Sequence, residues 1–121
     1  MKNLLKSGLV LALISLSSSS FAQIKNAKTA KVKVHGNCEM CEATIEKAIN
    51  QKNLTFGDWN KDCKILTVQY DGARTDLKKL LRKVAEAGYD NQYFTAPDKT
   101  YQQLPQCCQY KRPESNTKNP N

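Results

Sequence analysis

The chain has few residues of several kinds, and each scarcity argues against a class of protein. Only three of its 19 basic residues are arginines, Arg74, Arg82 and Arg112. Arginine is the side chain that most often reads base edges, so we expect no nucleic-acid partner. The longest apolar run, residues 8–16, is about half of the ~20 residues that cross a bilayer, which argues against a retained transmembrane anchor.

The first 22 residues have the features of a signal peptide. Lys2 and Lys6 precede the apolar run, and Ser20-Phe21-Ala22 places small residues at the positions that signal peptidase reads. We predict cleavage after Ala22 and a periplasmic or secreted protein. Removing Lys2 and Lys6 lowers the net charge of +8 to +6. The remaining lysines are scattered, which favours a solvated surface and a monomer.

The hydrophobic pattern predicts one domain at residues 28–95. The predicted elements are a strand at 28–34, a helix at 41–50, strands at 54–59 and 64–70, a helix from Thr75 to Gly88 and a strand at 91–95. This order folds most simply as an α+β, ferredoxin-like βαββαβ sandwich, with both helices on one face of a four-stranded antiparallel sheet. A C-terminal extension, 96–110, carries two cysteines, and residues 111–121 are expected to be disordered.

Two cysteines three positions apart, Cys38 and Cys41, lie where the first strand should give way to the first helix. Thiolates are soft ligands suited to Cu(I), Zn(II) and similar ions. The first turn of a helix favours a negatively charged sulfur at Cys41. A closed structural zinc site would need four ligands, and this loop supplies two. The pair therefore predicts an exposed site from which an ion can be transferred.

The C-x-x-C at this junction, the sequence I-E-x-A-I at 45–49 and the order of elements resemble the heavy-metal-associated domain. That domain occurs in copper chaperones, metal-pumping ATPases and periplasmic mercury-binding proteins. The resemblance covers residues 28–95. It implies a non-enzymatic protein that binds one soft ion through Cys38 and Cys41, either Cu(I) or Hg(II) and less readily Zn(II). It also implies transfer to a membrane transporter or efflux system, or sequestration.

The resemblance to this family also assigns expected positions to several residues near Cys38 and Cys41. Many members have a methionine at the position of Gly36. Asn37 and Tyr89 are expected beside the ion without binding it, because a family tyrosine or lysine at the latter position lies over the metal loop. We interpret Met40 as an outward-pointing apolar residue and His35 as a surface residue at the strand end.

The other three cysteines leave alternatives open. Cys63 lies in the predicted hairpin turn, 60–63, at the same end of the sheet as the pair, so it is a possible additional metal ligand or disulfide partner. The twelve residues from Thr95 to Cys107 reach at most about 40 Å, enough to return to the C-x-x-C loop. Cys107 or Cys108 is therefore either an extra thiolate or the disulfide partner of another cysteine.

Two other classes of protein use closely spaced cysteines outside the cytosol. A thioredoxin-like oxidoreductase places a proline-bearing loop opposite its C-x-x-C, whereas all four prolines here, Pro97, Pro105, Pro113 and Pro120, follow the predicted sheet. No third helix is predicted for such a fold. A domain stapled by disulfides is the remaining class, but cysteines three apart are placed to clamp an ion rather than to join distant strands. The redox protein stays the main alternative.

Overall fold

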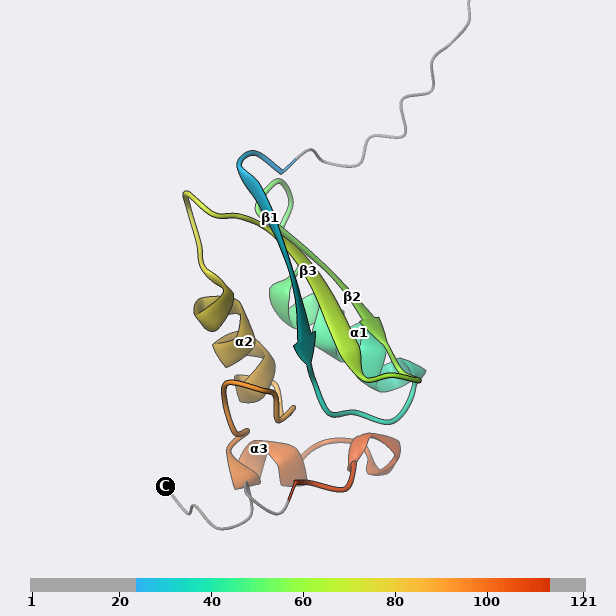
Figure 1. Ribbon diagram of the computed structural model, residues 1–121. Helices are drawn as coiled ribbons and strands as arrows, with labels where there is room; N and C mark the ends of the chain where they lie inside the picture. The colour runs from blue at the N-terminus through green and yellow to red at the C-terminus, as the bar shows by residue number, and fades with distance from the viewer. Residues whose placement is uncertain (1–23, 114–121) are drawn as a thin grey trace, which may run out of the picture.

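The computed structural model describes residues 24–113 (Figure 1). Its elements are β1 Ala27–Lys33, α1 Glu39–Ile49, β2 Thr55–Asn60, β3 Ile65–Asp71, α2 Leu77–Glu86, α3 Asp98–Gln102 and a single 3₁₀ turn, η1 Gln106–Cys108. The predicted signal peptide and residues 114–121 lie outside the described part. None of the helices within 24–113 has the length and apolar character needed to span a membrane.

The sheet is antiparallel, with β3 between β1 and β2. Side chains of each strand alternate between the core and the solvent, as in Thr55, Gly57 and Trp59 inward against Phe56 and Asp58 outward. The inward side chains share one core cluster with apolar side chains of α1 and α2. Both helices therefore cover the same face of the sheet, as predicted.

The two helices begin and end close to their predicted limits, with local corrections. Helix α1 begins at Glu39, two residues early, and Cys38 occupies its N-cap. Helix α2 is capped by Asp76, not by Thr75, because the Asp76 carboxylate accepts a hydrogen bond of 2.9 Å from the N–H of Lys79. Gly88 follows α2 with a φ of +113°, which other residues rarely adopt.

The prediction of a fourth strand at residues 91–95 is wrong. Only one isolated bridge, between Val34 and Asn91, lies at the free edge of β1. The side-chain oxygen of Asn91 accepts hydrogen bonds of 3.0 Å from the N–H groups of Tyr93 and Phe94. These bonds fold the backbone into a turn, so pairing with β1 stops after one bridge.

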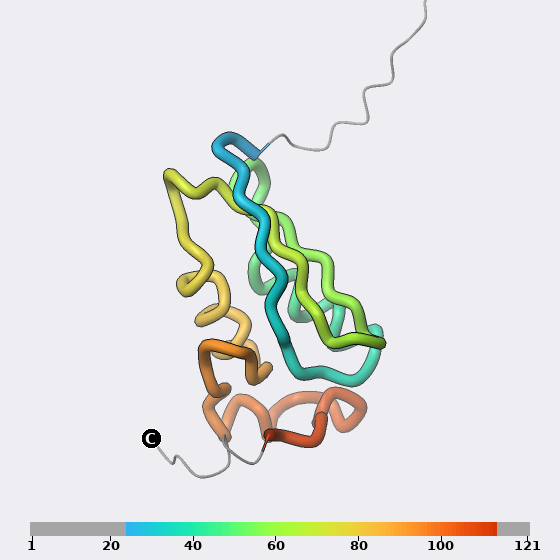
Figure 2. Tube along the Cα trace, viewed as in Figure 1, coloured from blue at the N-terminus to red at the C-terminus, as the bar shows by residue number. Residues whose placement is uncertain are grey.

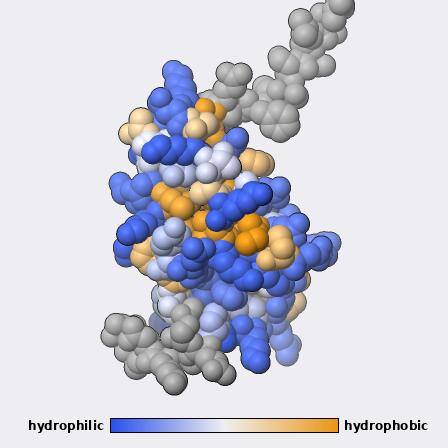
Figure 3. Space-filling model, viewed as in Figure 1, coloured by the Kyte–Doolittle hydropathy of each residue, from blue (hydrophilic) through white to orange (hydrophobic). Residues whose placement is uncertain are grey.

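Within residues 24–113, the outer edge of β1 is therefore unpaired along most of its length. Its sequence places lysine at three of seven positions, Lys28, Lys31 and Lys33. Lysines on an edge strand disfavour pairing with a second chain. The face seen in Figure 3 is mostly hydrophilic, with hydrophobic side chains gathered in its middle between α2 and the sheet.

The C-terminal extension packs across the end of the domain at which the β1–α1 loop lies (Figure 2). Cys108 and Tyr110 belong to the core cluster, and Tyr101 and Leu104 pack against it. Arg112 lies within the segment expected to be disordered, yet its guanidinium donates to the carboxylate of the buried Asp90 at 2.8 Å. The extension is thus part of the folded domain as far as Arg112.

Candidate metal centre

The β1–α1 loop holds Cys38 and Cys41 with their Sγ atoms 3.4 Å apart. Cys38 caps α1 with an extended backbone, and Cys41 lies in the first turn of the helix. The backbone N–H of Asn37 donates to the Cys41 sulfur at 3.4 Å. Cys38 is half-buried, whereas Cys41 is 0% exposed and belongs to the core. The expectation that both cysteines lie in an exposed corner is therefore wrong for Cys41.

A third sulfur lies beside this pair. The turn η1 brings the buried Cys108 to the loop, with its Sγ 3.7 Å from that of Cys38. The Sγ atoms of Cys38, Cys41 and Cys108 all lie within 4.8 Å of one another. The extension thus returns to the C-x-x-C loop, and Cys108 is the residue that faces the pair. We refer to these three cysteines as the sulfur triangle.

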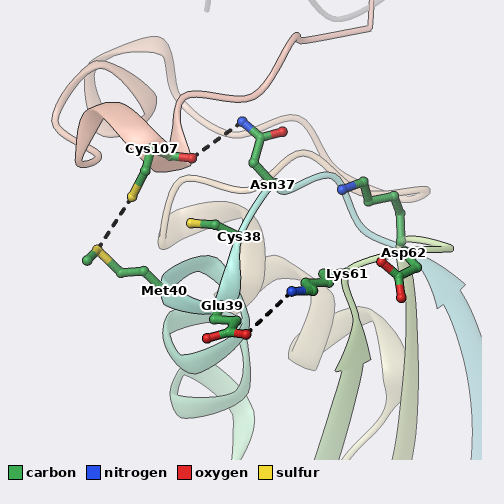
Figure 4. Close-up of a pocket in the computed structure, with 8 residues that line it drawn as sticks. Asn37, Cys38, Glu39, Met40, Lys61, Asp62 and Cys107 are labelled. Atoms are coloured by element: carbon green, nitrogen blue, oxygen red, sulfur yellow. Dashed lines mark hydrogen bonds and ion pairs between the residues drawn. The ribbon is translucent and has the colours of Figure 1, made fainter.

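The remaining two cysteines lie outside the triangle. Cys107 is exposed, and its Sγ lies 3.8 Å from the Sδ of Met40, which is itself 52% exposed (Figure 4). The carbonyl oxygen of Cys107 accepts a hydrogen bond of 3.4 Å from the side-chain amide of Asn37. Cys63 is exposed in the β2–β3 turn and is not a member of the triangle. Asn37 therefore joins the β1–α1 loop, which we call the metal loop, to η1.

An open pocket of about 640 Å³ lies in front of Cys38. Cys38, Met40 and Cys107 contribute to its lining (Figure 4). Lys61 and Glu39 also line the pocket, and they form an ion pair of 3.4 Å at exposed positions. Because Cys41 and Cys108 are fully buried, Cys38 is the triangle member that a second molecule can reach from this pocket.

The thiols of the triangle differ in acidity. The backbone N–H of Cys41 bonds the Cys38 sulfur and lowers the Cys38 pKa to about 7, against the opposing effect of burial. Burial raises the pKa of Cys108 well above its ordinary range, and the neighbouring Cys41 sulfur adds to the rise. Cys38 thus ionises near neutral pH, whereas Cys108 keeps its proton there.

The β1–α1 loop is supported from beneath by Trp59, which was not predicted from the sequence. The indole of Trp59 lies under Gly36, where an added Cβ would come within 2.9 Å of the ring. Its Nε1–H donates to the carbonyl oxygen of Val34 at 3.0 Å. Trp59 thus fills the space under the loop at Gly36. The alternation of β2 could have indicated this position, because Trp59 is the last inward-facing residue of the strand.

Tyr89 lies where the topology predicted, at the metal end of the domain, and it is 0% exposed. Its hydroxyl has no hydrogen-bond partner among the described residues. Burial raises the pKa of Tyr89, and the sulfurs of Cys108 and Cys41 raise it further. His35 stacks on Tyr110 with ring centroids 6.1 Å apart and is not a member of the triangle.

Comparison with known proteins leaves the family open and shows the fold. No family model matches the chain, and no curated protein matches it. A solved structure of a CopZ metallochaperone matches with a TM-score of 0.50 and 24% identity, over 53% of this chain and 98% of that one. The two chains share a fold. Since half of this chain covers nearly all of the other, the rest of this chain is additional to the shared domain.

Proposed function

We propose that this protein binds one soft metal ion through Cys38 and Cys41 and transfers or sequesters it. The observation that carries the proposal is the pair of sulfurs 3.4 Å apart at the start of a helix, one of them with a pKa lowered to about 7. Metals bind thiolates, not thiols, so a low pKa favours loading at neutral pH. Tyr89 and Asn37 support the loop without binding the ion.

Cu(I) is the first ion to test, because the matched structure is that of a metallochaperone named CopZ. Hg(II) suits thiolate ligands as well, and Zn(II) suits a bare pair less. In this proposal the chain works as a monomer in the periplasm or outside the cell after removal of residues 1–22. Its ion passes to or from a membrane transporter or efflux system that presents a thiolate to Cys38 through the open pocket.

A thiol–disulfide redox protein is the second candidate, favoured by the same sulfur–sulfur distance. The residue that faces Cys38 and Cys41 distinguishes the metal-binding protein from the redox protein. In thioredoxin-like proteins a proline-bearing loop lies opposite the cysteines, whereas here a third cysteine, Cys108, occupies that place. A third thiol next to the pair adds a ligand for a soft ion, so it favours metal binding.

The test is an anaerobic titration of the reduced protein with Cu(I) against a competing chelator, run beside an insulin-reduction assay. We expect one ion per chain and no insulin reduction above that of free thiol. The variant Cys38→Ser should lose tight binding, and Cys63→Ser, which changes an exposed cysteine outside the triangle, should keep it. Insulin reduction without stoichiometric binding would favour the redox protein instead.

A further inference from the structure

We propose that Cys108 is the third thiolate ligand of the site, so that the ion is held by three sulfurs and covered by the C-terminal extension. This inference rests on the proposed function and specifies its coordination. We call the covering segment, residues 97–112, the clasp. Its turn η1 contacts α1 and carries Cys108 to the pair.

The spacing of the sulfurs fits three-fold coordination better than two-fold. With metal–sulfur bonds of about 2.3 Å, three ligands in a plane lie about 4.0 Å apart, whereas two opposite ligands lie about 4.6 Å apart. The observed distances are 3.4 Å for Cys38–Cys41 and 3.7 Å for Cys38–Cys108, and Cys41 and Cys108 lie within 4.8 Å. A linear site would need a larger opening of the pair than a trigonal one.

The clasp is fixed by buried polar contacts, so Cys108 does not reach the site by chance. The hydroxyl of Tyr110 accepts from the N–H of Asp90 at 2.6 Å and donates to the carbonyl of Gly88 at 2.9 Å. Two residues on, Arg112 bonds the Asp90 carboxylate and the carbonyl oxygen of Ala96. These contacts join the C-terminal end of the clasp to residues 88–96, the segment after α2, and hold η1 over the β1–α1 loop.

Three thiolates change which ions the site holds and how it releases them. A three-sulfur site shifts preference toward Cd(II) and Zn(II) relative to a bare pair. Release proceeds by ligand exchange without a redox step: an incoming thiolate bonds the ion through the pocket, and one protein sulfur leaves and takes up a proton. The buried Cys41 and Cys108 leave last, so the clasp slows release.

The first probe is Hg(II), one equivalent per reduced chain under anaerobic conditions, and the second is Cd(II). X-ray absorption gives the number of sulfurs and the mean Hg–S distance, and the thiolate-to-mercury charge-transfer bands give an independent signature. We expect three sulfurs in the parent protein and in Cys107→Ser and Cys63→Ser. Cys108→Ser should show two sulfurs at a shorter mean distance. Cd(II) affinity should fall by at least about 10-fold in Cys108→Ser and hold in Cys107→Ser.

A second variant and a second readout keep the result interpretable. Cys108→Ala retains a small apolar side chain at this buried position and serves if the serine variant fails to fold, which circular dichroism reports. Two sulfurs in the parent protein, or a third sulfur lost in Cys107→Ser but kept in Cys108→Ser, would overturn the inference. Those results would leave the proposed function standing. Failure of Cys38→Ser to reduce one-to-one binding would overturn the proposed function instead.

Discussion

The sulfur of Cys108 lies 3.7 Å from that of Cys38, across 70 positions of the chain. A second contact joins the same two segments, because the side chain of Asn37 donates to the carbonyl of Cys107 at 3.4 Å. The metal loop and η1 are thus coupled both through sulfur and through a hydrogen bond. Any change that lifts the clasp should expose the loop, and a metal ion at the triangle should hold the two segments together.

The pair Cys38 and Cys41 should respond differently to serine substitution, although both variants should lose tight metal binding. Cys41→Ser places a hydroxyl at a fully buried position, which should lower the free energy of unfolding by about 1–3 kcal/mol. Cys38 is half-buried at the N-cap, where serine is a favoured residue, so Cys38→Ser should change stability little. Urea denaturation of the two metal-free variants measures this difference. Equal stability losses would contradict the placement of Cys41 in the core.

The reactivity of Cys38 should rise with pH at a lower pH than that of an ordinary thiol. Its pKa is lowered to about 7, mainly by the backbone N–H of Cys41, and the thiolate is the form that reacts with iodoacetamide. Mass spectrometry of the metal-free protein should show half-maximal alkylation of Cys38 near pH 7. In urea the same residue should follow the ordinary thiol range, about 8.5.

The same shift should make the metal-free protein more stable as the pH rises from about 7 to about 8.5. In this window the folded state holds Cys38 as a thiolate while the unfolded state still binds the proton, so stability increases with pH. The contribution is lost as the pH falls through the folded pKa. Burial raises the pKa of Cys108 in the folded state. Its thiol therefore stays protonated in both the folded and the unfolded protein until the pH reaches the range in which the unfolded thiol ionises. Chemical denaturation of parent and Cys38→Ser proteins across this range should show the slope only in the parent.

Gly36→Ala should damage the metal loop through its support. The new Cβ would lie 2.9 Å from the indole of Trp59 and 3.3 Å from the Cβ of Cys41, both buried groups that cannot move aside freely. We expect a loss of about 1–3 kcal/mol in stability and weaker metal binding. Trp59 is the only tryptophan, so its fluorescence reports both.

Gly72→Ala is the matched control, because its Cβ would meet the flexible side chain of Lys28. An unchanged emission and metal affinity in Gly36→Ala would show that the indole does not support the loop.

Tyr110→Phe should loosen the clasp while leaving the sheet and helices in place. The change removes the hydroxyl that bonds the N–H of Asp90 and the carbonyl of Gly88, and both backbone groups lose a buried partner. The expected cost is about 1–3 kcal/mol. Alkylation of Cys108 in the native metal-free protein should become faster.

Tyr93→Phe, at a residue 44% exposed, is the control and should change neither stability nor Cys108 protection. Equal protection of Cys108 in both variants would show that Tyr110 does not hold the clasp closed.

Short-range patterns in the sequence were enough for most of the domain. Alternation predicted β1, β2 and β3, helical spacing predicted α1 and α2, and Gly88 marked the end of α2. These signals are local, because side-chain direction repeats with the period of the element and one buried face selects the register. The pair Cys38–Cys41 was likewise visible, since both residues lie on one loop and the first turn of one helix.

The sequence by itself therefore determined the core domain and the cysteine pair, and only the tertiary structure decided what surrounds the pair. The predicted fourth strand does not form because the side-chain oxygen of Asn91 accepts hydrogen bonds from the backbone N–H groups of Tyr93 and Phe94, a local competition that propensity does not resolve. Whether Cys107 or Cys108 faces the loop depends on the rotation of η1. That rotation is fixed by the contacts of Tyr110 and Arg112 with the segment after α2, about 20 residues earlier in the chain. Such contacts have no period in sequence, so the third sulfur of the site appears only in the folded chain.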